Sequence, residues 1–138
     1  MLNLETFINA YLVTALWSSN DESNPETGGD PLDQNYSIDD IAPTDLKTLR
    51  AQCVNFLAAQ QAGDIIKDAI ETGKVACGPD FDEWGRAGHD FWLTRNGHGA
   101  GFWDGDWPEP QATQLTKICR QLPEVDLYVS DNDQIRIA

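Results

Sequence analysis

The first third of this 138-residue chain lacks positively charged residues altogether. Residues 1–46 contain no lysine, arginine or histidine, but they carry nine acids: Glu5, Asp21, Glu22, Glu26, Asp30, Asp33, Asp39, Asp40 and Asp45. The whole chain has 9 Lys and Arg against 23 Asp and Glu, a formal net charge of −14. Direct binding of nucleic acid needs clustered lysine and arginine to neutralise phosphates, so this charge argues against it. The same negative field repels anionic membrane surfaces and attracts basic protein surfaces or cations.

Cysteine is scarce and long hydrophobic runs are missing. Cys53, Cys77 and Cys119 do not have the spacing of a metal site, and an odd number leaves one thiol over. A disulfide framework is therefore not expected, and a reducing cytosol is favoured. Glu5 and Asn9 interrupt the apolar residues 2–17, and no basic segment precedes them, so we expect neither a signal peptide nor a membrane span. We expect a soluble, intracellular chain that folds as a single domain over residues 1–138.

Apolar residues at helical spacing predict several helices. The first pattern comprises Leu4, Phe7, Ile8, Tyr11, Leu12, Ala15 and Leu16. Thr44 is expected to cap a second helix, which Gly63 weakens and Gly73 ends, so one bent helix or two helices both fit. A last helix is expected from Ala112 to Leu122. Residues 18–43 form a long acidic loop that we expect to be ordered at least from Leu32 onward, with Leu32, Tyr36, Ile38 and Ile41 as anchors.

The stretch GHDFWLTRNGHGAGFWDGDW, residues 88–107, holds both histidines, three of the five tryptophans and several glycines. Asn-Gly between apolar runs is a strong signal for a β-hairpin, so we predict one that turns at Asn96-Gly97. That register places Phe91, Leu93 and Phe102 in the core and His89 opposite Asp104. It leaves Trp92 and Trp103 together on a partly exposed platform. A longer loop, residues 96–99, would shift this register and stays open.

Residues 125–137 alternate apolar and polar residues around Asp131-Asn132-Asp133, which predicts a second hairpin. The expected fold class is therefore α+β. N-terminal helices and the long acidic loop would pack on a small, mainly antiparallel sheet made of two β-hairpins separated by a helix.

Two runs, ALWSSNDESNPETGGDPLDQNYSIDDIAP and AGHDFWLTRNGHGAGFWD, resemble a widespread group of small tailed-phage and prophage proteins. With VDLYVSDNDQI, the resemblance covers about two thirds of the chain, and it does not extend to residues 46–80. It implies phage origin and a location in the cytoplasm of the infected bacterial host. It brings no activity and no catalytic residues.

These observations favour a protein that acts by binding, with a host protein of basic surface as its partner. Carboxylates can imitate phosphate charges, so an inhibitor of a nucleic-acid-targeting defence system, of the anti-restriction or anti-CRISPR type, is the specific hypothesis. Tryptophan is favoured at recognition surfaces because it buries a large area with few rotamers. The predicted partner-binding residues are Asp21, Glu22, Glu26, Asp30, Asp33, Asp39, Asp40, Trp92, Trp103, Asp104, Asp106 and Trp107.

The alternative is a metal- or nucleotide-dependent enzyme whose pocket lies at the Trp- and Gly-rich hairpin. His89, His98 and Asp104 are weak candidates for metal ligands, because a zinc or iron site needs three converging protein ligands. The acidic loop does not match a calcium-binding EF-hand. The chain has neither a nucleophile motif nor a phosphate-binding loop, so we expect no cofactor and no catalytic residue is assigned.

Overall fold

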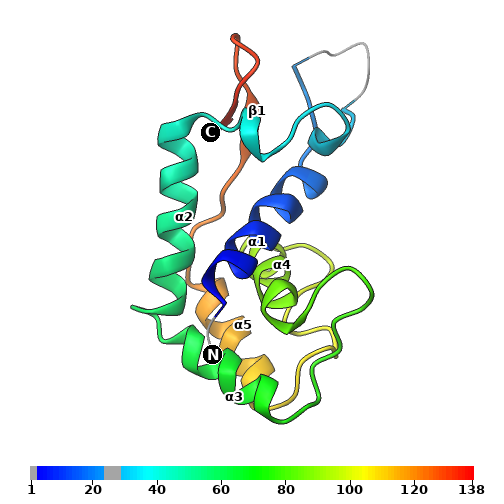
Figure 1. The fold of residues 1–138 in the computed structure, drawn as a ribbon, viewed down its shortest axis with the longest axis vertical. Helices are drawn as coiled ribbons and strands as arrows, with labels where there is room; N and C mark the ends of the chain where they lie inside the picture. The colour runs from blue at the N-terminus through cyan, green and yellow to red at the C-terminus, as the bar shows by residue number, and fades with distance from the viewer. Residues whose placement is uncertain (1–2, 24–28) are drawn as a thin grey trace.

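A computed structural model describes residues 3–23 and 29–138 of the chain (Figure 1). Within these ranges it contains five α-helices: α1 (Leu4–Ser18), α2 (Pro43–Leu57), α3 (Ala62–Glu71), α4 (Glu83–Arg95) and α5 (Gln111–Arg120). Two short 3₁₀ helices, η1 (Leu32–Gln34) and η2 (Ile38–Asp40), lie between α1 and α2. The chain ends in a hairpin of β1 (Leu127–Val129) and β2 (Ile135–Ile137).

The architecture is mainly helical, so the predicted α+β fold with helices on a sheet of two hairpins is wrong. In the described part of the chain the only sheet is the antiparallel pair β1–β2, in which Tyr128 lies opposite Arg136. This is the hairpin predicted around Asp131–Asp133, and its presence is confirmed. With three residues in each strand, it is too small to form a layer on which the helices could pack.

The predicted hairpin at Asn96-Gly97 is the main error, because residues 83–95 form helix α4. The side chain of Asp82 caps the start of α4 by accepting a hydrogen bond from the Gly85 amide at 2.7 Å. At the other end, the Gly97 amide donates to the carbonyl of Thr94, and the His98 amide donates to that of Leu93. Gly97 has φ of 68°, so Asn96-Gly97 forms a Schellman-type helix end. His89 consequently does not pair with Asp104.

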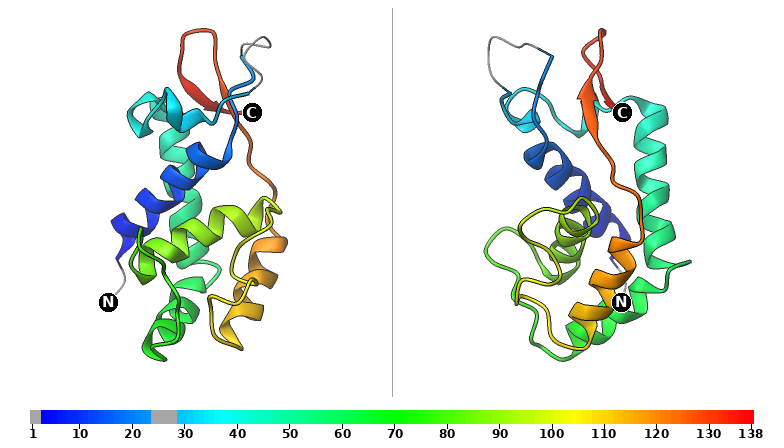
Figure 2. Two further views of the ribbon diagram at one scale, coloured as in Figure 1. Left: turned by 90° about the vertical axis from the view of Figure 1, so that its right-hand side faces the viewer. Right: turned by 180° about the vertical axis from the view of Figure 1, so that it is seen from behind.

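Helix α4 is surrounded by the rest of the molecule. This explains why its sequence pattern led to the wrong prediction of a β-strand. Phe91, Trp92 and Leu93 are consecutive and all buried, as no surface helix would allow. Helix α1 packs across one side of α4, and at Gly88 the α1 backbone at Phe7 and Tyr11 leaves no room for a side chain. The two views of Figure 2 show α4 between α1 and the segment that leads into α5.

The centre of the core is a group of aromatic side chains from four parts of the chain. The rings of Phe56 and Phe91 stack with centroids 3.9 Å apart and an interplanar angle of 4°. Phe7, Tyr11 and Phe102 surround this pair. The prediction that Phe91, Leu93 and Phe102 belong to the core is confirmed by their burial, although the hairpin that suggested it does not exist.

The remaining helices lie where they were predicted, but Thr44 does not cap the second one: α2 begins at Pro43, with Ala42 as its N-cap residue and no side-chain cap. Helix α1 follows the predicted pattern, and the second helical region is two helices, α2 and α3, separated where Gln61 adopts φ of 61°. The loop after α1 is anchored by Leu32 and Ile41, which are buried, and by the Ala42 amide, which donates to the carbonyl of Ile135 at 2.9 Å. Across residues 3–23 and 29–138, no helix has the length and apolar character needed to cross a bilayer.

Candidate functional site

Acidic residues from two distant parts of the chain meet at one end of the molecule. Figure 1 shows residues 29–42 and the tip of the C-terminal hairpin at the same end, with α3 at the opposite end. We call this surface the acidic end and define it by the carboxylates of Asp21, Glu22, Asp30, Asp33, Asp39, Asp40, Asp131 and Asp133. It therefore combines predicted binding residues of the loop with hairpin residues that sequence reasoning did not select.

Three carboxylates of the acidic end lie close enough to Tyr36 to change the pKa of its hydroxyl. Desolvation raises the pKa of the Tyr36 hydroxyl above its usual value, and the carboxylates of Asp21, Asp133 and Asp40 raise it further. These carboxylates come from three separate segments, so their fields overlap at one phenol. The nearby base Arg136 does not cancel this field, because its guanidinium is held by Asp45 at 3.1 Å.

Next to the acidic end, the exposed side of α1 forms the floor of two hollows. The Trp17 pocket has a volume of about 520 Å³ and is lined by Asn9, Val13, Thr14, Trp17, Asp33, Asp80, Phe81 and His89. The Tyr36 hollow, of about 460 Å³, is lined by Asn9, Val13, Leu16, Asp33, Tyr36, Ser37, Ile38 and Asp39. Both volumes are within the range of small-ligand sites. Because the hollows share Asn9, Val13 and Asp33, they form one continuous depression that leads toward the acidic end.

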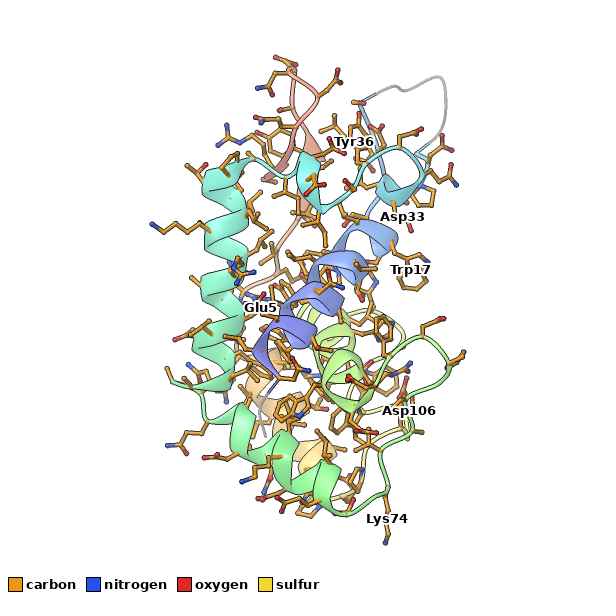
Figure 3. All side chains as sticks on the ribbon, in the orientation of Figure 1. Glu5, Trp17, Asp33, Tyr36, Lys74 and Asp106 are labelled. Carbon is orange, nitrogen blue, oxygen red and sulfur yellow. The ribbon has the colours of Figure 1, made fainter. Side chains whose placement is uncertain are left out.

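Trp17 and His89 form the aromatic part of the Trp17 pocket together with Phe81. Trp17 is 54% exposed and points away from α1 beside Asp33, as Figure 3 shows. The ring centroids of Trp17 and His89 lie 6.3 Å apart, and those of Phe81 and His89 lie 5.2 Å apart. His89 of α4 thus lies between two aromatic neighbours, one from α1 and one from the segment before α4.

The orientation of His89 is fixed by the buried carboxylate of Asp90. The Nδ1 atom of His89 lies 2.8 Å from Oδ1 of Asp90, whose side chain is fully buried. In the neutral tautomer in which Nδ1 donates to this carboxylate, Nε2 is the acceptor of the ring. The arrangement holds the imidazole in one position at the wall of the pocket.

Asp90 also connects the pocket to the segment after α4. Its Oδ2 accepts a hydrogen bond from the Trp107 indole at 2.7 Å and lies 3.4 Å from Nε of Arg86. Arg86 in turn donates to Asp106 at 2.7 Å. Burial raises the pKa of the Asp106 carboxyl, the neighbouring Asp104 raises it further, and the Arg86 guanidinium opposes both. These interactions of Asp90, Trp107, Arg86 and Asp106 stabilise the part of the structure that holds His89.

The predicted binding tryptophans are therefore not a platform. Trp92 is buried, and its indole donates to the hydroxyl of Ser18 at 2.7 Å. Trp107 is buried against Asp90. Trp103 is 46% exposed, but it lines a different hollow with Lys117 and Arg120 of α5. The predicted pairing of Trp92 with Trp103 fails because one is inside a helix and the other is in a loop.

The other predicted site residues are scattered. Asp104 and Asp106 lie beside Arg86, away from the acidic loop, and Glu26 is outside the described residues. His89 and His98 line separate hollows that share Trp17. Among the residues that the structure describes, no three His, Cys, Asp or Glu side chains gather in a way that could hold a metal ion.

Sequence reasoning missed Trp17, Phe81, Asp80 and Tyr36 as functional candidates. One signal was available: Asn9, Val13 and Trp17 are spaced by four residues, so they share a face of α1 that the core residues do not use. A tryptophan on the polar face of an amphipathic helix is a candidate for recognition. Nothing in the sequence shows that residues 80–89 approach this face.

The three thiols do not form a reactive centre in the described structure. Burial raises the pKa of Cys53 and of Cys119 far above that of a free thiol. Desolvation raises the pKa of Cys77, and the Glu83 carboxylate at 3.8 Å from its sulfur raises it further. Since the thiolate is the nucleophile, all three should react slowly at neutral pH.

We therefore expect the native protein to react with Ellman's reagent at Cys77 alone, and more slowly than free cysteine does. The raised pKa shifts the thiolate population, so the rate should rise toward higher pH than for free cysteine over about pH 7–10. Glu83→Gln should move the rate profile partway back toward lower pH. Fast reaction of two or three thiols in the folded protein would contradict the burial of Cys53 and Cys119.

Comparison with known proteins adds no relative: the chain matches no family model, no curated protein and no solved structure.

Proposed function

We propose that this protein acts by binding a partner protein through the acidic end, and that the contacted surface of the partner is basic. The observation that carries the proposal is the convergence of carboxylates from residues 21–40 and from the hairpin turn on Tyr36. The nearby base is engaged internally, because Arg136 is paired with Asp45. An uncompensated field of one sign accelerates association with a surface of the opposite sign.

Several arginines outside the acidic end also have partners within the protein. Arg50 is bonded to Glu5 at 2.7 Å, Arg86 to Asp106, and Arg95 to the carbonyl of Pro123 at 2.7 Å. These cations stabilise the fold and are less available to attract anionic partners. The net charge of −14 is thus presented mostly by exposed carboxylates.

The specific form that we favour is an inhibitor of a host defence protein that acts on nucleic acid. Spaced carboxylates on a rigid surface can occupy a groove that otherwise binds phosphates. The resemblance to tailed-phage proteins makes a bacterial host protein the expected partner. The enzyme alternative placed its pocket at the predicted hairpin, whereas residues 83–95 form helix α4 and the hollows near this stretch lie on different sides of it.

The test compares two triple variants with the same change in charge. In the first, Glu22→Gln, Asp39→Asn and Asp131→Asn alter exposed residues of the acidic end; in the control, Asp64→Asn, Asp68→Asn and Glu71→Gln alter exposed residues of α3 at the opposite end. Each immobilised protein is used to capture partners from a bacterial host lysate at low and at physiological salt.

We expect wild type and the α3 control to retain a common partner that the acidic-end variant loses or retains weakly. Association should slow by about tenfold in the acidic-end variant, with a smaller change in dissociation. Excess DNA or RNA should displace the protein if it occupies a nucleic-acid groove. A partner that is held equally by both variants, and at all salt concentrations, would overturn the proposal, because physiological salt largely screens the attraction between exposed charges more than about 8 Å apart.

A further inference from the structure

We propose that the Trp17 pocket binds the guanidinium group of an arginine side chain presented by the partner. The proposal rests on the proposed function for the source of the arginine, but the pocket itself can be tested without the partner. It assigns a second, more specific contact next to the acidic end, on the shared depression of the Trp17 pocket and the Tyr36 hollow.

The aromatic wall fits a planar cation. Trp17 is the largest and most exposed ring, and the imidazole of His89 lies beside it with an interplanar angle of 29°. The ring of Phe81 is also close to His89, with an interplanar angle of 47°. A guanidinium is planar and weakly hydrated, so it stacks on aromatic faces better than a compact ammonium does, and indole is the best such face.

The polar groups of the pocket fit a group that only donates hydrogen bonds. Asp33 and Asp80 are exposed carboxylates at its edge, and a guanidinium has five N–H donors and no acceptor. In its neutral form with Nδ1 donating to Asp90, His89 offers Nε2 as an acceptor. The Asn9 side chain supplies a further acceptor oxygen.

Thr14 adds an unpartnered polar group to the wall of the pocket. Its side chain lines the Trp17 pocket and the residue is only 1% exposed. Within the described residues, Oγ1 of Thr14 has no hydrogen-bond partner. A buried hydroxyl without a partner costs stability, and an N–H donor that enters the pocket would satisfy it.

Charge excludes the other simple classes of ligand. None of the described residues that line the Trp17 pocket is a lysine or an arginine, so a phosphate or carboxylate would meet the carboxylates of Asp33 and Asp80 with His89 as the sole basic side chain among them. A wholly apolar side chain would desolvate these carboxylates without compensation. A cation with a planar, partly apolar head can stack on the aromatic rings and pair with the carboxylates.

The experiment uses a matched pair of small probes, N-acetyl-arginine amide and N-acetyl-citrulline amide. Citrulline has nearly the same shape but carries no charge, and sodium chloride is added to its samples so that the ionic strength is equal. Binding is followed by NMR through the indole signal of Trp17 and the ring signals of His89. The variants are Trp17→Ala and the double variant Asp33→Asn with Asp80→Asn, with Trp103→Ala as the control for an exposed tryptophan elsewhere.

We expect a saturable shift of both signals with the arginine probe, at a Kd of about 1 mM, and binding about tenfold weaker for the citrulline probe. The double Asp variant should weaken arginine binding to a similar extent. In Trp17→Ala the shift is read at His89 and should also show about tenfold weaker binding, whereas Trp103→Ala should bind as wild type does. Circular dichroism establishes that each variant is folded.

The proposal is overturned if the arginine probe gives no saturable shift up to about 0.1 M, or if the citrulline probe binds equally well. Either result would leave the proposed function standing, because that rests on the acidic-end triple variant, in which the lining residues of the Trp17 pocket are unchanged. Conversely, arginine binding at Trp17 together with equal partner capture by both triple variants would refute the acidic-end contact and retain the pocket.

Discussion

Replacing Gly88 with alanine should destabilise the folded protein by about 3 kcal/mol or more. A Cβ atom at this position would lie 2.1 Å from the carbonyl oxygen of Phe7, 3.0 Å from its carbonyl carbon and 3.2 Å from the Tyr11 amide nitrogen. These are backbone atoms of α1, which cannot rotate away as the end of a side chain can. Helices α1 and α4 would have to separate, and the aromatic core between them would loosen.

The expected sign is opposite to that of helix propensity. In an exposed helix, replacing glycine with alanine stabilises by about 1 kcal/mol. A large loss at Gly88 would therefore report the close approach of α1 and α4 rather than the backbone preference of the residue. The measurement is the urea midpoint followed by circular dichroism.

Gly99→Ala is the control, because a Cβ at Gly99 would meet no atom within 4 Å. This variant should unfold within about 0.5 kcal/mol of wild type. If Gly88→Ala proves neutral or stabilising, α4 does not cross α1 at this glycine, and the position of His89 over the Trp17 pocket would have to be revised.

The same glycine explains why the fold could be predicted only in part. Helices α1 and α5 and the C-terminal hairpin follow from apolar spacing and turn residues, because each has one face on the core and one in water. Helix α4 has neither a polar stripe nor an apolar stripe, since its surroundings bury Trp84, Phe91, Trp92 and Leu93 together. Its pattern matches a strand as well as a helix.

Asn96-Gly97 added a second ambiguity. A type I′ turn and a Schellman helix end both require glycine at positive φ, so the dipeptide marks a change of direction without deciding between them. The decision comes from tertiary contacts: the Asn96 side chain donates to the Trp92 carbonyl at 3.0 Å and accepts from the Val125 amide at 2.7 Å. No local pattern contains Val125.

The candidate site, too, could be predicted from the sequence only in part. The acidic loop could be selected from composition, because charge is a property of the sequence alone. The Trp17 pocket could not, because it is formed where α1 meets residues 80–89, and their approach depends on the packing of Gly88 on Phe7. The hairpin acid Asp133 was missed for a similar reason: only the fold brings it beside Tyr36.

The second large effect is expected at Asp90, where substitution by alanine should cost about 3–5 kcal/mol. Its side chain is fully buried and serves three groups: the Trp107 indole at 2.7 Å, Nδ1 of His89 at 2.8 Å and the Arg86 guanidinium at 3.4 Å. Removing the carboxylate leaves the indole without an acceptor and a partly buried guanidinium with less compensation. Asp90→Asn should cost less, because its amide oxygen can still accept from Trp107.

Asp106→Asn is the matched control, because Asp106 also pairs with Arg86 but its side chain is 33% exposed. Water can replace its interaction, so the expected cost is at most about 1 kcal/mol. Urea unfolding of the three variants gives the order Asp90→Ala, Asp90→Asn, Asp106→Asn, from least to most stable. Substitution of Asp90 should also weaken binding in the Trp17 pocket, because Asp90 holds the ring of His89. Even while Asp90→Asn stays folded, its His89 signals should shift less on addition of the arginine probe.

Equal stability of Asp90→Ala and Asp106→Asn would mean that the buried carboxylate does not stabilise α4, and that His89 is held by its aromatic neighbours alone.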